Sequence, residues 1–374
     1  MHRNYNHMKT PKLITLAAAV AFTACSGGYR QNLDDPRALL LGRLDSYAQH
    51  KTVAYGHQDD LSYGHNWRVE DWMSDPLDRS DVKDVTGCYP MVAGFDLGGI
   101  EMGDESNLDG VPFGLIRKAA LAHADRGGII TFSWHPRNPL TGGDAWDVSS
   151  DRVVNSILRG QTDFGLWLAR LGDFLESLGP DVAFIFRPWH ENLASWFWWG
   201  KDLCSAGEYQ QLYQMTWLYL TEERGLGNIV WCYSPNGDCG AEAFMERYPG
   251  DKYVDMLGID TYQFQNNKTF QEAGRDYITE VRASLDYLKD LCAQQGKIMC
   301  FSETGFEGIP DPSWWTEALY PAIMGYPLSY VLTWRNAHDR PAHYYAAWEG
   351  SPDAPDMKAF SEKESILFLK PLDK

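Results

Sequence analysis

Two patterns of apolar and polar positions follow each other in turn along most of this chain. Short runs rich in β-branched and aromatic residues are typical of buried strands, and longer segments with apolar residues at helical spacing separate them. The runs that predict strands are Val53–His57, Tyr89–Phe95, Gly128–Trp134, Val182–Phe186, Asn228–Tyr233, Val254–Asp260, Lys297–Ser302 and Leu328–Trp334. Segments with helical periodicity include Pro36–Gln49, Phe113–Arg126, Val153–Leu178, Gly207–Glu223, Phe270–Gln294 and Pro312–Met324.

This alternation predicts an α/β fold in which eight strand–helix units close into a (β/α)8 TIM barrel. One catalytic domain is expected over residues 35–374, because no linker separates a second unit. In such a barrel the chemistry collects where the strands end. The polar residues at the expected strand ends are His57 to Asp60, Asp96, His135, Arg187 to Glu191, Asp260 to Tyr262, Glu303 and Arg335.

The fourth strand end carries the densest chemistry. Arg187, His190 and Glu191 come together there, and four consecutive aromatic residues, 196–199, follow. Large rings beside a carboxylate are typical of a core edge or of a platform for sugar rings. We interpret Trp196 and Trp334 as platform residues, whereas Trp198, Trp199 and Trp231 are left open between platform and core.

The amino-acid composition limits the classes of molecule that the chain could bind. The chain has 33 Lys and Arg against 51 Asp and Glu, a net charge of −18, which argues against nucleic acid and against an anionic membrane surface. Aromatic residues make up 14% of it, including 15 Trp, which favours a neutral carbohydrate polymer. We expect a monomer without a cofactor.

No metal site is expected. His190 and Glu191 do not begin an HExxH motif, because Ala194 stands where the second His would be. His57, Asp59, Asp60 and His65 are better interpreted as sugar-binding or capping groups than as ligands. Among the cysteines, Cys232 with Cys239 and Cys292 with Cys300 are candidate disulfides, and buried free thiols are the alternative.

Two glutamates suit the cleavage of a glycosidic bond. That reaction needs a proton donor for the leaving oxygen and a second carboxylate at the anomeric carbon. Glu191 after the fourth strand and Glu303 after the seventh are expected to face each other across the barrel mouth. Opposed strands can bring them to about 5–5.5 Å, the separation of a retaining pair.

Three motifs in barrel order resemble glycoside hydrolase family 26, a clan A family dominated by β-1,4-mannanases. They are Trp189-His190-Glu191, Ser302-Glu303-Thr304-Gly305 and Trp334-Arg335. The resemblance implies that Glu191 is the acid/base and Glu303 the nucleophile. It also implies a substrate-binding role for His135, Arg187, His190, Trp196, Tyr262, Trp334 and Arg335. Of these, Tyr262 is expected to donate a hydrogen bond to Glu303, with Arg187 reinforcing it from beneath.

The predicted activity is therefore a retaining β-1,4-mannanase acting on mannan, glucomannan or galactomannan, either internally or by releasing mannobiose. The segments Leu97–Asp109 and His57–Trp72 are candidates for a wall that closes the distal subsites. A family 26 β-xylanase or β-glucanase is an alternative. So is a surface glycan-binding lipoprotein without turnover, against which the intact pair of glutamates speaks.

The N-terminus predicts export. Basic residues precede the apolar run Leu13–Phe22, and Thr23-Ala24-Cys25 resembles a bacterial lipoprotein signal. Residues 1–24 are expected to be a signal peptide, Cys25 the lipidated residue and 25–34 a tether. A lipid anchor is then the expected link to a membrane. The domain itself is expected in the periplasm or at the cell surface.

Overall fold

Eight parallel strands form a closed barrel in the computed structural model, which describes residues 35–371. They follow chain order around the barrel, and β1 pairs with β11 to close it, with Ala54 opposite Tyr330 and His57 opposite Thr333. The strands are β1 (Val53–Gln58), β5 (Val92–Asp96), β6 (Ile129–Trp134), β7 (Phe184–Pro188), β8 (Ile229–Tyr233), β9 (Met256–Gln263), β10 (Ile298–Phe306) and β11 (Leu328–Thr333). The predicted TIM barrel is confirmed. The predicted signal peptide, tether and lipidated Cys25 lie outside the described residues.

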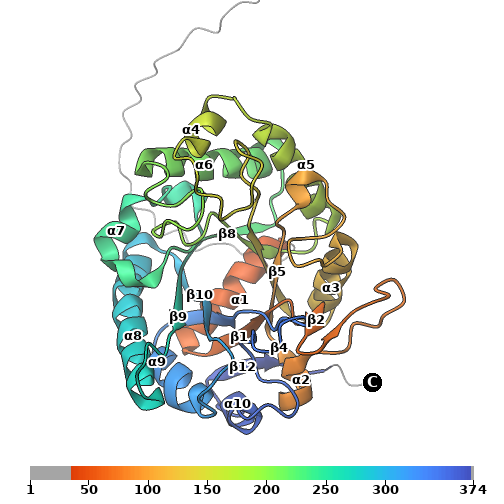
Figure 1. Cartoon of the computed structure of the whole chain (residues 1–374), viewed down its shortest axis with the longest axis vertical. Helices are drawn as coiled ribbons and strands as arrows, with labels where there is room; N and C mark the ends of the chain where they lie inside the picture. Colours follow the sequence, from red (N-terminus) through yellow and green to blue (C-terminus); the bar gives the residue numbers. More distant parts are fainter. Residues whose placement is uncertain (1–34, 372–374) are drawn as a thin grey trace, which may run out of the picture.

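Helices surround the strands, and α1 lies across one end of the barrel (Figure 1). They are α1 (Pro36–His50), α2 (Asp81–Thr86), α3 (Phe113–Asp125), α4 (Val153–Leu158), α5 (Phe164–Ser177), α6 (Ala206–Trp217), α7 (Gly240–Glu246), α8 (Phe270–Gln295), α9 (Tyr320–Ile323) and α10 (Ala354–Ser361). The longest, α8, begins at a capping box in which Thr269 and Glu272 accept each other's backbone N–H. It ends at Gly296, whose φ of 65° is typical of a left-handed helix stop.

Two expected elements are divided in the structure. The helix predicted over Val153–Leu178 is two helices, α4 and α5, because Gly160 turns the chain with a φ of 67°. The strand predicted over Tyr89–Phe95 is divided into β4 (Tyr89–Pro90) and β5. The short β4 pairs with β12 (Ile366–Leu369), which lies beside the start of β1.

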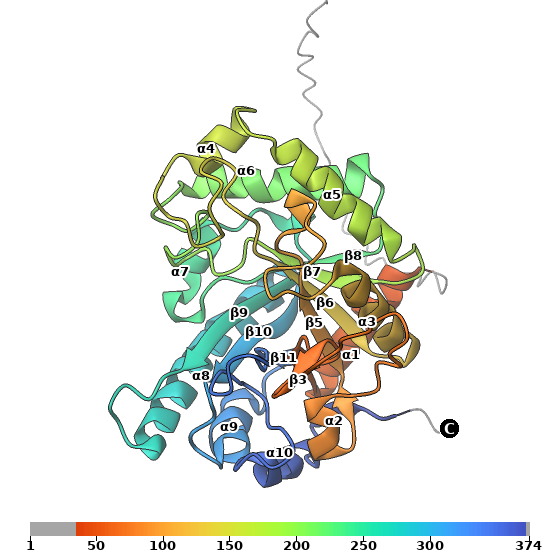
Figure 2. The ribbon, with the colours of Figure 1, turned by 45° about the vertical axis from the view of Figure 1, so that its right-hand side comes forward.

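The strands β9 and β10 run beyond their predicted ends and project together from the barrel (Figure 2). Pairing between them shifts register between Phe301 and Glu303, which is a β-bulge at Ser302. A bulge re-aims the next side chain. Glu303 is therefore delivered from within a strand rather than from the loop after it.

The segments after β1 and β5 cover one side of the barrel mouth. The first contains the hairpin of β2 (Tyr63–Gly64) and β3 (Trp67–Arg68). The second contains the turn Ile100–Met102, which packs against α5 (Figure 2). Arg335, just after β11, forms an ion pair with Asp109 of this second segment, so the two sides of the mouth are joined here.

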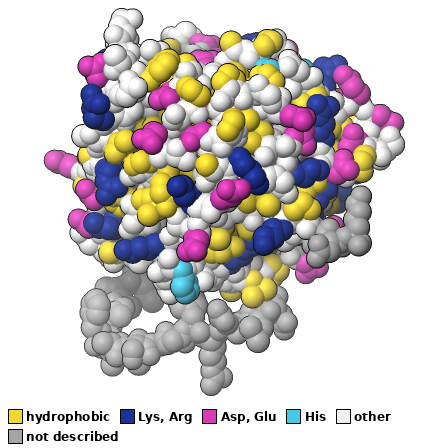
Figure 3. Space-filling model, turned by 90° about the horizontal axis from the view of Figure 1, so that it is seen from below, with side chains coloured by type: hydrophobic (Ala, Val, Ile, Leu, Met, Phe, Trp, Pro, Cys, Tyr) yellow, Lys and Arg dark blue, Asp and Glu magenta, His cyan; other side chains and the backbone are white. Residues whose placement is uncertain are grey.

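The face in Figure 3 carries lysine and arginine side chains interspersed with acidic ones rather than a field of one sign. No helix within residues 35–371 is both long enough and apolar enough to span a bilayer. The six cysteines of this part of the chain are free, so neither candidate disulfide is present. The barrel instead brings Cys232 and Cys300 together, with 3.7 Å between their sulfur atoms.

Candidate active site

Glu191 lies on a strained turn directly after β7. Trp189 and Glu191 have φ angles of 57° and 51°, in the left-handed region that residues other than glycine rarely adopt. The turn is held by hydrogen bonds from Glu191 N to Ser234 O at 2.9 Å and from Trp199 Nε1 to His190 O at 2.8 Å. Backbone strain of this kind costs of order 1–3 kcal/mol per residue and clusters at functional sites.

Glu303 is held by two side chains from neighbouring strands. Tyr262 donates its hydroxyl proton to Glu303 Oε2 at 2.8 Å, and Arg187 donates from Nη2 to Oε1. Arg187 also contacts Asp260 Oδ2, through Nη1, at 2.8 Å. Because the guanidinium lies between two carboxylates, it fixes both and offsets their charge.

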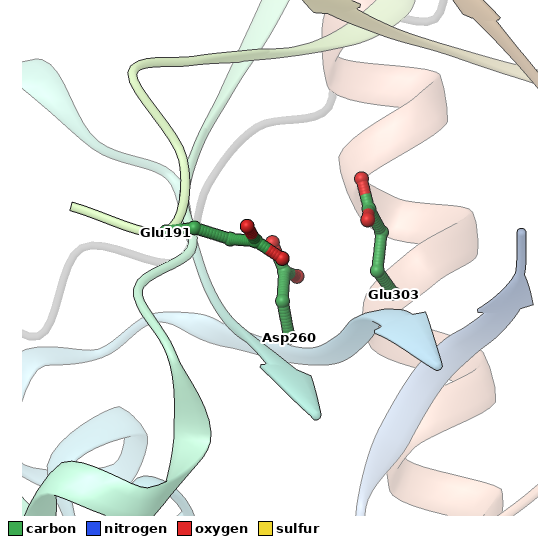
Figure 4. Close-up of side chains that lie close together, drawn as sticks. All are labelled: Glu191, Asp260 and Glu303. Carbon is green, nitrogen blue, oxygen red and sulfur yellow. The ribbon is translucent and has the colours of Figure 1, made fainter. Parts of the chain in front are cut away.

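Three carboxyl groups converge at this place (Figure 4). One oxygen from each of Glu191, Asp260 and Glu303 lies within 4.8 Å of the others. Glu191 reaches in from the turn after β7, while Asp260 and Glu303 rise from β9 and β10. Such a cluster can hold a metal ion, but Arg187 already supplies positive charge to Asp260 and Glu303.

The two glutamates that were predicted as a pair have different electrostatic surroundings. Burial and the charge of Glu303 raise the pKa of Glu191 to about 7, although Trp196 and Arg187 oppose the shift. Glu303 instead accepts two hydrogen bonds, from Tyr262 and from the Arg187 guanidinium. Glu191 can therefore still hold a proton near neutral pH and give it to a leaving group.

An open cleft of about 570 Å³ gives access to both glutamates. Trp196 is 47% exposed on its wall and donates its indole proton to Glu191 Oε2 at 2.8 Å. Other predicted site residues that line the cleft are His135, His190, Tyr262 and Trp334. Further lining residues are Trp146, Phe197, Gln263, Phe264, Gln265, Phe306, Glu307, Pro310 and Tyr345.

Two predicted substrate-binding residues do not line this cleft. Arg187 is buried beneath Glu303, and Arg335 is paired with Asp109 at 2.9 Å and lies near the hydroxyl of Tyr63. Glu307, just after β10, is exposed and also lines the cleft.

Several residues left open by the sequence are structural. Trp198, Trp199 and Trp231 are at most 2% exposed and belong to the core. Trp189 packs against Trp134 in the same core. Of the polar residues once weighed as metal ligands, His57 bonds Asp60, Asp59 accepts from Tyr63 and His65 stacks on Trp348. None of these polar residues lines the cleft.

The sequence reasoning did not assign a role to Asp260, Trp146 or Tyr345. Asp260 precedes Tyr262 by two residues on one strand, so alternation places both on the same face and marks Asp260 as inward-pointing. Trp146 and Tyr345 come from irregular loops, where no periodic signal marks a side chain as part of a site.

A (β/α)8 barrel with two carboxyl groups facing each other at the carboxyl ends of its strands defines the class of barrel glycoside hydrolases. Residues 42–303 match the model of Glycosyl hydrolase family 26. The chain belongs to this family, as the three motifs had indicated.

Individual relatives support this assignment to the family. A β-mannanase of this family from Bacteroides ovatus is 42% identical in sequence, with a TM-score of 0.83 over 91% of this chain and 96% of that one. A mannan endo-1,4-beta-mannosidase from Bifidobacterium adolescentis is 29% identical over 94% of this chain, and one from Bacillus subtilis is 31% identical over 50% of it. This chain spans 37% of the length of the first of these two curated relatives and 54% of the second.

Proposed function

We propose that this chain hydrolyses β-1,4-mannosidic bonds in mannan, glucomannan or galactomannan with retention of anomeric configuration. The observation that carries the proposal is the pair of opposed glutamates, of which Glu191 has a raised pKa and Glu303 accepts hydrogen bonds from Arg187 and Tyr262. Oxygens of Glu191 and Glu303 lie within 4.8 Å, well short of the roughly 6.5–9.5 Å between the carboxyls of an inverting pair.

In the proposed mechanism the carboxylate of Glu303 attacks the anomeric carbon while Glu191 gives its proton to the leaving oxygen. The products of this step are the shortened glycan and a glycosyl ester on Glu303. Glu191, now ionised, then takes a proton from a water molecule that attacks the same carbon. The ester bond breaks, and both glutamates return to their starting states.

The residues around the pair have distinct parts in this proposal. Tyr262 and Arg187 hold Glu303 aimed at the anomeric carbon through their hydrogen bonds to its two oxygens. Trp196 orients Glu191 and offers its exposed face to the sugar on the leaving-group side. On the wall opposite that side, His135, His190 and Trp334 would contact the sugar whose bond is cut, and Arg335 would support this wall through Asp109.

Mannan is the proposed substrate because the relatives named above carry mannanase names. The ion pair between Asp109 and Arg335 supports a closed end to the cleft, because it ties together the segments after β5 and β11. A closed end favours release of mannobiose from chain ends over random internal cutting. The N-terminal pattern around Cys25 supports export and lipid anchoring as part of the same proposal.

Chromatography of the products from mannan, β-1,3-xylan and lichenan tests the substrate directly. We expect oligosaccharides from mannan alone. If oligosaccharides were released from xylan or lichenan and not from mannan, the mannanase proposal would be wrong and the xylanase or glucanase alternative would replace it. If wild-type protein bound these glycans and released nothing from any of them, the chain would be a binding protein.

A further inference from the structure

A carboxylate outside the cleft is bound to one of its histidines. Asp96, the last residue of β5, is 1% exposed and does not line the cleft. It accepts hydrogen bonds from Gly98 N at 2.7 Å, Ser133 Oγ at 2.7 Å and His135 Nδ1 at 2.6 Å. The last contact has the short length of a charge-assisted hydrogen bond.

The contact with Asp96 determines which hydrogen bond the second ring nitrogen of His135 can make. With Nδ1–H directed at Asp96, the second nitrogen, Nε2, faces His190 Nε2 at 3.1 Å. The His135 ring is held in place because it stacks on Trp146 with an angle of 13° between the rings. The two facing nitrogens must share one proton, and the carboxylate behind His135 favours a doubly protonated imidazolium there.

The charges around the two rings also favour a proton on His135 rather than on His190. Burial lowers the pKa of His135, but Asp96, Glu303 and Glu191 outweigh burial and raise it above its ordinary value. Burial, Arg187 and His135 lower the pKa of His190. The charged groups facing the pair are Asp96 on β5, Asp109 after it, Arg187 on β7, Glu191 after it and Glu303 on β10. His135 is therefore the donor and His190 the acceptor.

His190 is the middle residue of the strained turn that presents Glu191. Its Nδ1 is buried without a partner among the described residues, so the contact with His135 orients its ring. Because the neighbours on both sides have left-handed backbone, a freely rotating His190 would loosen the turn. A line of contacts thus runs from β5 through His135 to the acid/base.

We propose that Asp96 is a positioning residue, which acts through His135 and His190 to hold the turn that carries Glu191. The inference rests on the proposed function, since it assigns Glu191 its catalytic part. Because the negative charge of Asp96 balances the imidazolium, His135 can donate to His190 without adding net positive charge where positive charge develops on the sugar.

Asp96→Asn tests the inference with two readouts. In protein labelled with ¹⁵N-histidine, we expect His135 to be protonated on both nitrogens at pH 7 in the wild type and to lose one proton in the variant. The kcat on mannan should fall roughly 10- to 100-fold, the range for a misplaced catalytic group, with KM little changed. The alkaline limb of the pH profile should move to lower pH, because His135 then deprotonates first.

Two further variants separate positioning from folding. Ser133→Ala removes a hydrogen bond to the same carboxylate but leaves its charge, so we expect a lower Tm with unchanged histidine spectra and pH profile. In a His135→Gln background, Asp96→Asn should add less than about a twofold loss, because residues in one network are not additive.

Unchanged His135 spectra in Asp96→Asn, or losses that multiply in the double variant, would overturn the inference. The spectra need no substrate. A wild-type protein without hydrolytic activity would therefore refute the proposed function and leave the histidine test readable.

Discussion

Glu191 shows most clearly how one residue's surroundings determine its chemistry. Its carboxyl is partly buried beside an ionised glutamate, and its pKa of about 7 follows from burial and that charge. An ordinary glutamate titrates near 4.3 and would have no proton to give at neutral pH. The strained turn and the Trp196 hydrogen bond keep this carboxyl in place despite the cost.

Loss of the proton donor should depend on the leaving group. Glu191→Ala is expected to lower kcat on mannan by about 10²–10⁴-fold, the usual contribution of general acid catalysis. An aryl mannobioside with a good leaving group needs no proton, so the burst that reports the glycosyl-enzyme should persist. Stopped-flow absorbance measures that burst.

Glu307→Ala is the matched control, because this carboxylate lines the same cleft but bonds His343. Its activity is expected to stay within about threefold of wild type, as for a surface substitution. An equal loss by Glu191→Ala on both substrates would contradict its role as the acid.

The pH dependence of kcat/KM should report the same group. Activity requires protonated Glu191, so it is expected to fall as pH rises through about 7. Initial rates on a soluble mannan oligosaccharide from pH 4 to pH 9 measure this limb. A profile that stays flat to pH 9 would show that Glu191 is not the group whose protonation matters.

At the scale of elements, the pattern of the sequence predicted the barrel because strand and helix periodicities differ and alternate. It also predicted Glu191 just after β7, where the structure has it, whereas Glu303, predicted after the seventh strand, lies within β10. It did not predict the bulge at Ser302 or the turn at Gly160, because both depend on tertiary pairing and on single backbone angles. Trp146 was missed for a related reason, since loop conformation has no sequence period.

The loops after β5 and β11 provide an element-scale prediction. Asp109→Ala removes the ion pair with Arg335, so the segment after β5 should loosen and open the end of the cleft. Products from mannohexaose are expected to shift from mannobiose toward longer early fragments. Chromatography at low conversion measures them.

Glu70→Ala is the control for this variant. It removes an exposed ion pair with Arg68 beside the same wall and should leave the products unchanged. If early products were identical in Asp109→Ala and wild type, the pair would not close the cleft.

For the whole molecule, the raised pKa of Glu191 is a cost to stability. The unfolded chain ionises this group near 4.3, whereas the folded protein holds its proton until about pH 7. The contribution of protonated Glu191 to the free energy of unfolding is therefore complete below the unfolded pKa. It is lost as pH rises through 7. Above that pH the folded state carries a penalty of about 4 kcal/mol.

Glu191→Gln removes this penalty because the amide does not titrate. The variant is expected to be more stable than wild type by up to about 4 kcal/mol at pH 8, with the difference disappearing below about pH 4. Denaturant unfolding across this range measures it. Glu242→Gln, on the exposed surface of α7, should show no such dependence. A Glu191→Gln curve parallel to wild type at every pH would contradict the assigned pKa.

The whole arrangement serves one central claim, that Glu191 and Glu303 together cut a β-mannosidic bond with retention. Proton NMR of the first product released from a mannan oligosaccharide tests this most directly. The geometry predicts that the new reducing end appears first as the β-anomer and only later equilibrates. An α-anomer as the first product would contradict the account, because it would require water to attack between two widely separated carboxyl groups.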